Sequence, residues 1–180
     1  EEVAAAASIA QASGVLKENE SDMIENLLNL DEMKVHEIFT PRSVMFALDK
    51  KLFLDSFTCE QCPVNFDKIK EYSRIPIYDE NIDNMIGLVI SKEYFHEYIT
   101  KQHDNKEQII KPVYKINENI PVSKLLNLFL SRNEHLFIVV DNYDQTQGVV
   151  TLEDAIETLL GIEIVDELDN NIDLREVAKI

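Results

Sequence analysis

In the first part of the chain, hydrophobic positions recur at the spacing of amphipathic helices. The pattern predicts a helix over 2–13, which is rich in alanine and ends at Gly14. It predicts a second helix over 20–30, with Ser21 as its N-cap. A short helical stretch over 34–39 follows, and it stops before a proline because the residue preceding proline disfavours the helical conformation.

The rest of the chain shows one order of elements twice, each time from a proline. After Pro41 the pattern predicts an extended segment, a polar irregular stretch, a helix, two strands joined by a turn, and another helix. After Pro112 the same order is predicted without the irregular stretch. In the first half the expected elements are an extended segment over 41–48, a helix over 66–72, strands over 75–78 and 85–90 joined by a turn over 79–84, and a helix over 91–99. In the second half they are a strand over 113–116, a helix over 121–130, strands over 136–140 and 148–150 joined by a turn over 142–147, and a helix over 152–160.

Alignment of the two halves indicates an internal duplication. Pro41 corresponds to Pro112 at an offset of 71 residues, and Gly87 corresponds to Gly148 at an offset of 61. A unit of about 60 residues is too small to be stable alone, so we expect the two to pack together with pseudo-two-fold symmetry. The apolar strand 136–140 is typical of a sheet covered by helices. The predicted fold is α/β (α+β), with two β-α-β-β-α repeats behind an N-terminal helical lead.

The composition supports a folded core and excludes several classes of protein. Apolar residues make up 45% of the 180 residues, and no apolar run approaches the roughly 18 residues of a membrane span. The start of the chain lacks the basic region of a signal peptide, so we expect a soluble chain. The net charge of −17 argues against nucleic acid as a partner.

The negative charge is concentrated at the two ends of the chain. Residues 1–37 carry a net charge of −7 and residues 163–180 carry −4, which leaves −6 on the long middle part. The weaker field in the middle is compatible with an anionic small molecule as ligand.

No enzyme constellation is recognisable, and we expect no catalytic activity. The four glycines are too far apart for a phosphate-binding loop, and the four histidines lack metal-ligand spacing. The pair Cys59 and Cys62 cannot form a four-ligand zinc site alone. Two reduced thiols and a redox pair are the alternatives for these cysteines.

Four segments, in a fixed order and spacing, resemble a known family. They are Ile38-Phe39-Thr40-Pro41-Arg42, the stretch 72–78 (YSRIPIY), the stretch 148–154 (GVVTLED) and the acidic stretch 161–169. Together they resemble a tandem pair of CBS domains, or Bateman module, of the CorC, hemolysin-like and cyclin-M family of magnesium and cobalt transport proteins.

The resemblance implies a domain organisation and a set of partners. It implies a helical linker from a membrane domain over 1–33, a first CBS repeat over 34–100, a second over 107–162, and an acidic tail over 163–180. The chain would be a regulatory fragment on the cytoplasmic face of the membrane. It would bind ATP or AMP between the repeats, with Mg²⁺ held through the phosphates, and form a homodimer through the CBS repeats. The alternative is a ligand-free module for dimerisation or scaffolding.

The motif Thr151-x-x-Asp154 is the principal candidate site. It lies where a predicted strand passes into a helix, so a hydroxyl and a carboxylate meet at the helix start and can hold two ribose hydroxyls. The same spacing is that of a capping box. The two roles are compatible, and the resemblance favours ribose binding.

The resemblance assigns roles to further residues around the nucleotide. Thr40 and Pro41 would lie against it; the alternative is that Thr40 merely precedes the proline that ends the helix. The planar guanidinium of Arg74 suits phosphate, although one of the many acids is a competing partner. Tyr72 either stacks on adenine or packs in the core. Apolar walls are expected from Ile75, Val149 and Val150.

The first repeat departs from this motif. Ile90 and Glu93 stand where the second repeat has Thr151 and Asp154. Ile90 has no hydroxyl and Glu93 is one methylene longer than Asp154. The second, symmetry-related site is therefore expected to be weak or empty, with one nucleotide per chain.

Overall fold

The N-terminal helices largely follow the predicted pattern. The computed structural model describes residues 2–58, 64–100 and 106–162. Helix α1 (Glu2–Ala12) is followed by Gly14 at φ +76°, and helix α2 (Glu18–Asn29) comes next. The prediction of Ser21 as N-cap was wrong, because Ser21 is buried inside α2. The helix is capped instead at Lys17, whose main-chain N–H donates to the Glu20 carboxylate at 2.9 Å.

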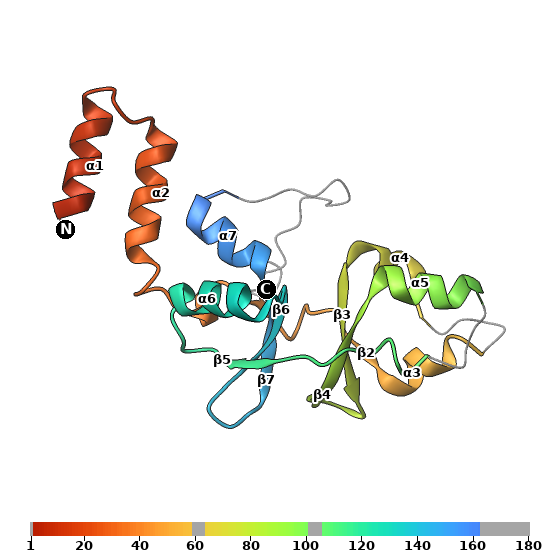
Figure 1. Cartoon of the computed structure of the whole chain (residues 1–180). Coiled ribbons are helices and arrows are strands. Elements are labelled where there is room, and N and C mark those ends of the chain that lie inside the picture. The colour runs from red at the N-terminus through yellow and green to blue at the C-terminus, as the bar shows by residue number, and fades with distance from the viewer. Residues whose placement is uncertain (1, 59–63, 101–105, 163–180) are drawn as a thin grey trace.

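Two small sheets, each with its own helices, make up the rest of the molecule (Figure 1). A 3₁₀ turn η1 (Val35–Glu37) and strand β1 (Thr40–Pro41) lead into them. The first repeat contains β2 (Leu48–Asp49), α3 (Lys50–Asp55), α4 (Phe66–Glu71), β3 (Arg74–Asp79), β4 (Asn81–Ile90) and α5 (Ser91–Thr100). The second contains β5 (Lys115–Asn117), α6 (Val122–Arg132), β6 (Leu136–Val140), β7 (Thr146–Thr151) and α7 (Leu152–Leu160).

The strand pairings confirm the predicted duplication. The sheet orders are β2-β3-β4 and β1-β7-β6-β5, and in each repeat a parallel pair is followed by an antiparallel pair. The registers correspond as well, because Arg74 lies opposite Ile90 as Leu136 lies opposite Thr151. The α/β class and the two β-α-β-β-α repeats are thus confirmed.

Each repeat is tied to the other by the segment that precedes it. Strand β1 precedes the first repeat but pairs with β7 of the second, with Thr40 opposite Val149. In the same way Lys111 precedes the second repeat and bridges to Leu88 of β4 in the first. This exchange of lead segments gives the two repeats their approximate two-fold relation.

The exchange explains why glycine occupies corresponding positions in β4 and β7. A Cβ on Gly87 would lie 2.5 Å from the carbonyl oxygen of Lys111. A Cβ on Gly148 would overlap the carbonyl oxygen of Thr40. Main-chain atoms cannot yield as a flexible side chain can, so both crossings require a residue without a side chain.

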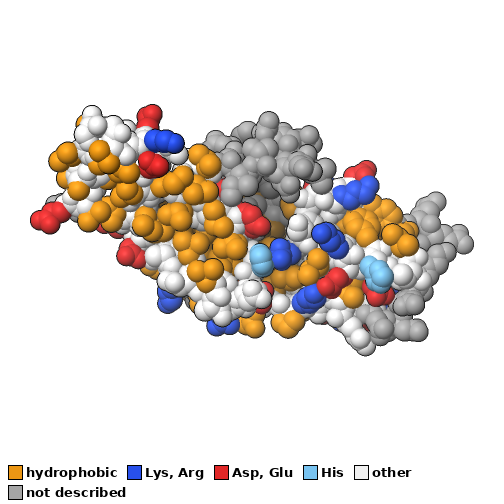
Figure 2. All heavy atoms as spheres, turned by 45° about the horizontal axis from the view of Figure 1, so that its top comes forward, with side chains coloured by type: hydrophobic (Ala, Val, Ile, Leu, Met, Phe, Trp, Pro, Cys, Tyr) orange, Lys and Arg blue, Asp and Glu red, His pale blue; other side chains and the backbone are white. Residues whose placement is uncertain are grey.

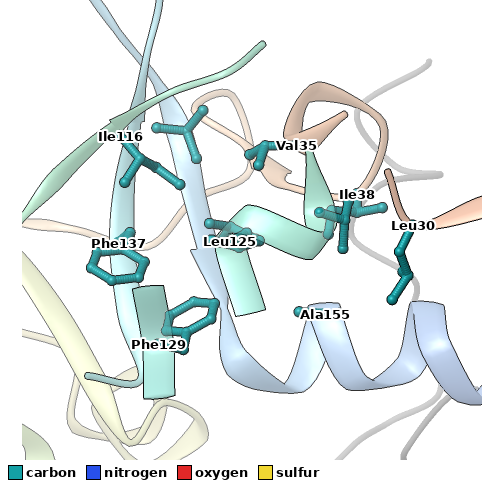
Figure 3. Packing of buried hydrophobic residues seen from close by; sticks show 11 residues of the cluster. Leu30, Val35, Ile38, Ile116, Leu125, Phe129, Phe137 and Ala155 are labelled. Atoms are coloured by element: carbon teal, nitrogen blue, oxygen red, sulfur yellow. The ribbon is translucent and has the colours of Figure 1, made fainter. Parts of the chain in front are cut away.

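Three clusters of buried hydrophobic residues pack on the faces of the two sheets. One cluster lies between the second sheet and its helices and contains Phe129 and Phe137 (Figure 3). Another fills the first repeat around Phe53 and Tyr94. The third lies between the two sheets, and we call it the inter-sheet cluster; its buried members are Met85, Leu88, Leu136, Ile138, Val140 and Val149. All five residues of β6 are buried, as the apolar strand predicted.

The structure corrects the prediction between Pro41 and the first helix of the repeat. The chain turns after Pro41, with the Val44 N–H donating to the Pro41 carbonyl at 3.1 Å, and only β2 is extended. The stretch predicted as irregular begins with helix α3, which the Asp49 carboxylate caps by accepting the Lys51 N–H at 2.8 Å. The cap signal was present in the sequence, but a helix of six residues shows too little periodicity to stand out.

Smaller differences concern the turns and strand ends. The turn predicted over 79–84 is much shorter, because β4 begins at Asn81 after Glu80 at φ +60°. Strand β5 begins at Lys115, two residues later than predicted. Cys59, Cys62 and the acidic tail 163–180 lie outside the described residues. Within the described ranges, none of the helices has the length and hydrophobicity needed to span a bilayer.

Candidate functional site

Thr151 and Asp154 are hydrogen-bonded to each other at the start of α7. The Asp154 N–H donates to the Thr151 hydroxyl oxygen at 3.2 Å. In return, Asp154 Oδ2 accepts the Thr151 N–H at 2.7 Å and the Thr151 hydroxyl at 2.8 Å. The capping-box alternative is therefore confirmed. Both side chains are partly buried and held in one arrangement, so the cap also presents a hydroxyl and a carboxylate together.

The lead segment of the first repeat lies beside this pair. Thr40 is opposite Val149 and Pro41 is opposite Gly148, so β1 pairs with the middle of β7. The strand is too short to have been predicted as such, and its pairing with the other repeat has no local signal. Thr40 and Thr151 are thus far apart in the sequence but lie on neighbouring strands.

Arg74 projects from the first sheet toward the second repeat, and Thr151 projects from the second sheet toward the first repeat. Side chains alternate along a strand, and cross-strand partners share a face. Arg74 is paired with Ile90, which packs against the inter-sheet cluster, and Thr151 is paired with Leu136, a buried member of that cluster. Arg74 and Thr151 therefore stand on the facing surfaces of the two sheets.

The Arg74 guanidinium has no acid partner in the described part of the chain. Its side chain is half-buried and forms no hydrogen bond or ion pair with a described residue. In a protein with a net charge of −17, a partly desolvated arginine without a carboxylate beside it is unexpected. The alternative of a surface arginine paired with an acid is not seen among these residues.

Tyr72 and Ile75 lie in packed surroundings. The Tyr72 ring stacks on Phe46 with 5.1 Å between the ring centroids, and it packs against the first repeat's cluster. The Ile75 side chain is only 1% exposed and faces the helices of its repeat. Val150 is likewise fully buried on the helix side, whereas Val149 belongs to the inter-sheet cluster. The side chains of Ile75 and Val150 therefore face the helices of their own repeats and do not line the space between the sheets.

The corresponding place in the first repeat is chemically different. Glu93, the counterpart of Asp154, forms an ion pair with Lys111, which is itself the counterpart of Thr40. Ile90 replaces the threonine. Sequence reasoning missed Lys111, although its position before Pro112 matches that of Thr40 before Pro41.

Basic side chains gather on one part of the surface. Figure 2 shows Lys, Arg and His side chains grouped toward the half of the molecule that carries the first repeat. Apolar side chains are spread instead over the end that carries α1 and α2. Asp and Glu side chains lie among these basic groups in the same view, so the surface charge there is mixed.

Comparison with known proteins identifies the class to which this fold and site belong. A family model for the CBS domain matches residues 107–161. A solved structure of the CBS domain of a bacterial CNNM/CorC family Mg²⁺ transporter has a TM-score of 0.77 and 32% identity, covering 92% of this chain and 97% of that one. A structure of such a domain in complex with ATP has a TM-score of 0.66 and 34% identity, covering 81% and 99%.

Curated proteins give the same family. A UPF0053 protein of Synechocystis is 32% identical over 96% of this chain and 48% of its own length. The magnesium and cobalt efflux protein CorC of Vibrio cholerae is 28% identical over 94% of this chain and 57% of its own. The chain belongs to the CBS domains of the CNNM/CorC family, as its sequence motifs indicated. It spans about half the length of these two relatives.

Proposed function

We propose that the chain is the regulatory CBS pair of a membrane ion transporter of the magnesium and cobalt type, and that it binds ATP between its repeats. The observation that carries the proposal is the position of Thr151, at the end of β7, and Asp154, at the start of α7, across from Arg74 on the facing sheet, which is half-buried and has no acid partner among the described residues. A relative 34% identical to this chain was solved with ATP bound, which supports the choice of nucleotide.

Each proposed site residue is assigned to the part of the nucleotide that its side chain can bind. Thr151 and Asp154 hold the ribose hydroxyls, with Thr40 and Pro41 at the edge of the sugar. Arg74 binds the phosphates through its planar fork of donors. Tyr72 and the Val149 side chain border the adenine, and Ile75 supports this wall from the core of the first repeat. Mg²⁺ is held through the phosphates and water, because it dehydrates reluctantly.

The signal to the membrane part passes through the helical lead. Helix α7 begins at the proposed ribose site and packs against α2, where the Asn26 amide donates to the Leu159 carbonyl at 3.3 Å. A nucleotide that favours one arrangement of the repeats therefore biases the position of α2. The bias is limited to the difference in ATP affinity between the two arrangements. A homodimer through the CBS repeats on the cytoplasmic face of the membrane completes the proposal.

Calorimetric titration with ATP, ADP and AMP, with and without Mg²⁺, tests the proposal. We expect saturable binding of ATP, and Asp154→Ala should weaken it about tenfold or more, since two hydrogen bonds of roughly 1 kcal/mol each are lost. Glu153→Ala is the matched control, because it removes the same charge from an exposed neighbouring position. Thermal melting separates lost affinity from lost capping. If folded protein gives no heat with any of the three nucleotides, the ligand-free scaffold is the better interpretation.

A further inference from the structure

Arg42 lies where three segments of the chain meet, directly after β1. Its main-chain N–H donates to the Gln147 carbonyl at 2.6 Å, and its Nη1 donates to the Thr146 carbonyl at 3.1 Å. The same Nη1 lies 3.3 Å from Oδ1 of Asp83, on β4 of the first repeat. That oxygen also accepts the Thr146 N–H at 2.8 Å. Arg42 and Asp83 thus join the lead segment, β4 and β7 in one polar network.

We propose that Arg42 and Asp83 are positioning residues for the nucleotide site, acting through β1 without contact with the ligand. They hold Thr40 and Pro41 against β7 and at the same time fasten the first repeat to the second. The inference rests on the proposed nucleotide function and adds to it the residues that keep the site assembled.

The geometry of β1 makes such an anchor necessary. The strand consists of two residues, and Pro41 has no N–H to donate to β7. The Arg42 N–H and guanidinium extend the contact to Gln147 and Thr146, at the other end of β7 from Thr151. Release of this end would free β1 to move away from Val149, and Thr40 would move with it.

The network anchors the lead segment that carries the proposed nucleotide contacts Thr40 and Pro41. The counterpart of Arg42 in the second lead segment is Val113, an apolar residue that packs against the inter-sheet cluster. The lead that carries Thr40 is therefore anchored by a charged network, whereas the lead that carries Lys111 is not anchored in this way. This asymmetry matches the asymmetry between the two candidate sites.

The sign of one substitution separates positioning from simple electrostatics. Asp83→Ala removes a negative charge, so Coulomb attraction alone would make an anionic nucleotide bind more tightly. Loss of the anchor predicts the opposite, a weakening of ATP binding by about threefold to tenfold for the hydrogen bonds lost. Arg42→Gln should weaken ATP binding in the same range. Both side chains are partly exposed, at 42% for Arg42 and 33% for Asp83, so the variants should fold.

Asp67→Ala is the matched control, because Asp67 also forms an ion pair, with Lys70 at 3.4 Å on α4. ATP affinities of the two alanine variants are compared by calorimetry, and amide hydrogen exchange of Arg42 and Thr146 is followed by NMR without nucleotide. We expect weaker ATP binding and faster exchange at both amides for Asp83→Ala only. Equal affinities for Asp83→Ala and Asp67→Ala, or unchanged exchange, would overturn the inference. Absence of ATP binding by the unmodified chain would instead count against the proposed function, and the exchange measurement would still test the anchor.

Discussion

At the scale of single residues, Arg74 distinguishes a nucleotide site from a scaffold. A guanidinium that is half removed from water loses hydration and needs an anion or other acceptors to compensate. The described acids do not supply one. A module that only dimerises has no need of an arginine that lacks a partner, among the described residues, on the face that meets the other repeat.

Substitution of Arg74 should therefore affect nucleotides according to their phosphates. Arg74→Gln is expected to weaken ATP about tenfold or more, the effect of a lost charge-assisted hydrogen bond, and to weaken adenosine little. Arg132→Gln is the control, since Arg132 lies over the Tyr114 ring at 4.7 Å in the second repeat. Titrations of adenosine, AMP and ATP into both variants give the comparison. An equal loss for adenosine and ATP would show that Arg74 supports the fold of the site and does not bind phosphate.

Thr151 shows why a motif alone leaves the role of a residue open. The sequence predicted both a cap and a ribose ligand, and the structure confirms the cap through hydrogen bonds of 2.7 to 3.2 Å. Capping fixes the two side chains before any ligand arrives, so little rotamer entropy is lost on binding. The cap thus prepares the pair for the proposed role.

At the scale of elements, periodicity predicted most of the helices and strands but not their pairing. The first and last residues of strand 136–140 and of helix 152–160 were predicted correctly, because each element is long enough to show its hydrophobic pattern. The pairing of β1 with β7 joins residues more than one hundred positions apart, and no local pattern encodes it. For the same reason the network around Arg42 could not be foreseen, whereas the alignment of the repeats already placed Lys111 and Glu93 in correspondence with Thr40 and Asp154. The candidate site was predicted by its residues, and its assembly came from the exchanged lead segments.

The two glycines at these crossings provide a test of the exchange. Gly148→Ala would drive a Cβ into the Thr40 carbonyl, and Gly87→Ala would drive one into the Lys111 carbonyl. Both should lower the free energy of unfolding by about 1–3 kcal/mol, the usual cost of overpacking. Only Gly148→Ala displaces β1, so only this variant should also weaken ATP. Denaturant unfolding and ATP titration of the pair measure both effects, and an equal change in ATP affinity would contradict the assignment of β1 to the site.

At the scale of the whole molecule, the repeats share a fold and differ in their chemistry. Each lead segment crosses to the other repeat, and each last strand of the hairpin ends where a helix begins. One such place carries Thr40, Thr151 and Asp154. The other carries Lys111, Ile90 and Glu93, and there the carboxylate is already engaged by the lysine. An internal ion pair thus takes the place that a ligand would have at the symmetry-related position.

We therefore expect one ATP per chain, with the two acidic positions unequal in effect. Asp154→Ala should abolish or strongly weaken the one site. Glu93→Ala makes the same change at the symmetry-related position. It should leave the stoichiometry at one ATP per chain and change the ATP affinity by less than about twofold. Its effect on stability should be below roughly 1 kcal/mol, because the Lys111–Glu93 pair is more than one-third exposed. Calorimetry on the unmodified chain and on the two variants measures the number of sites and the affinity. Two equal sites in the unmodified chain, or a loss of ATP binding on Glu93→Ala, would contradict this prediction. Either result would mean that the first repeat also binds nucleotide and that the Lys111–Glu93 ion pair opens to admit it.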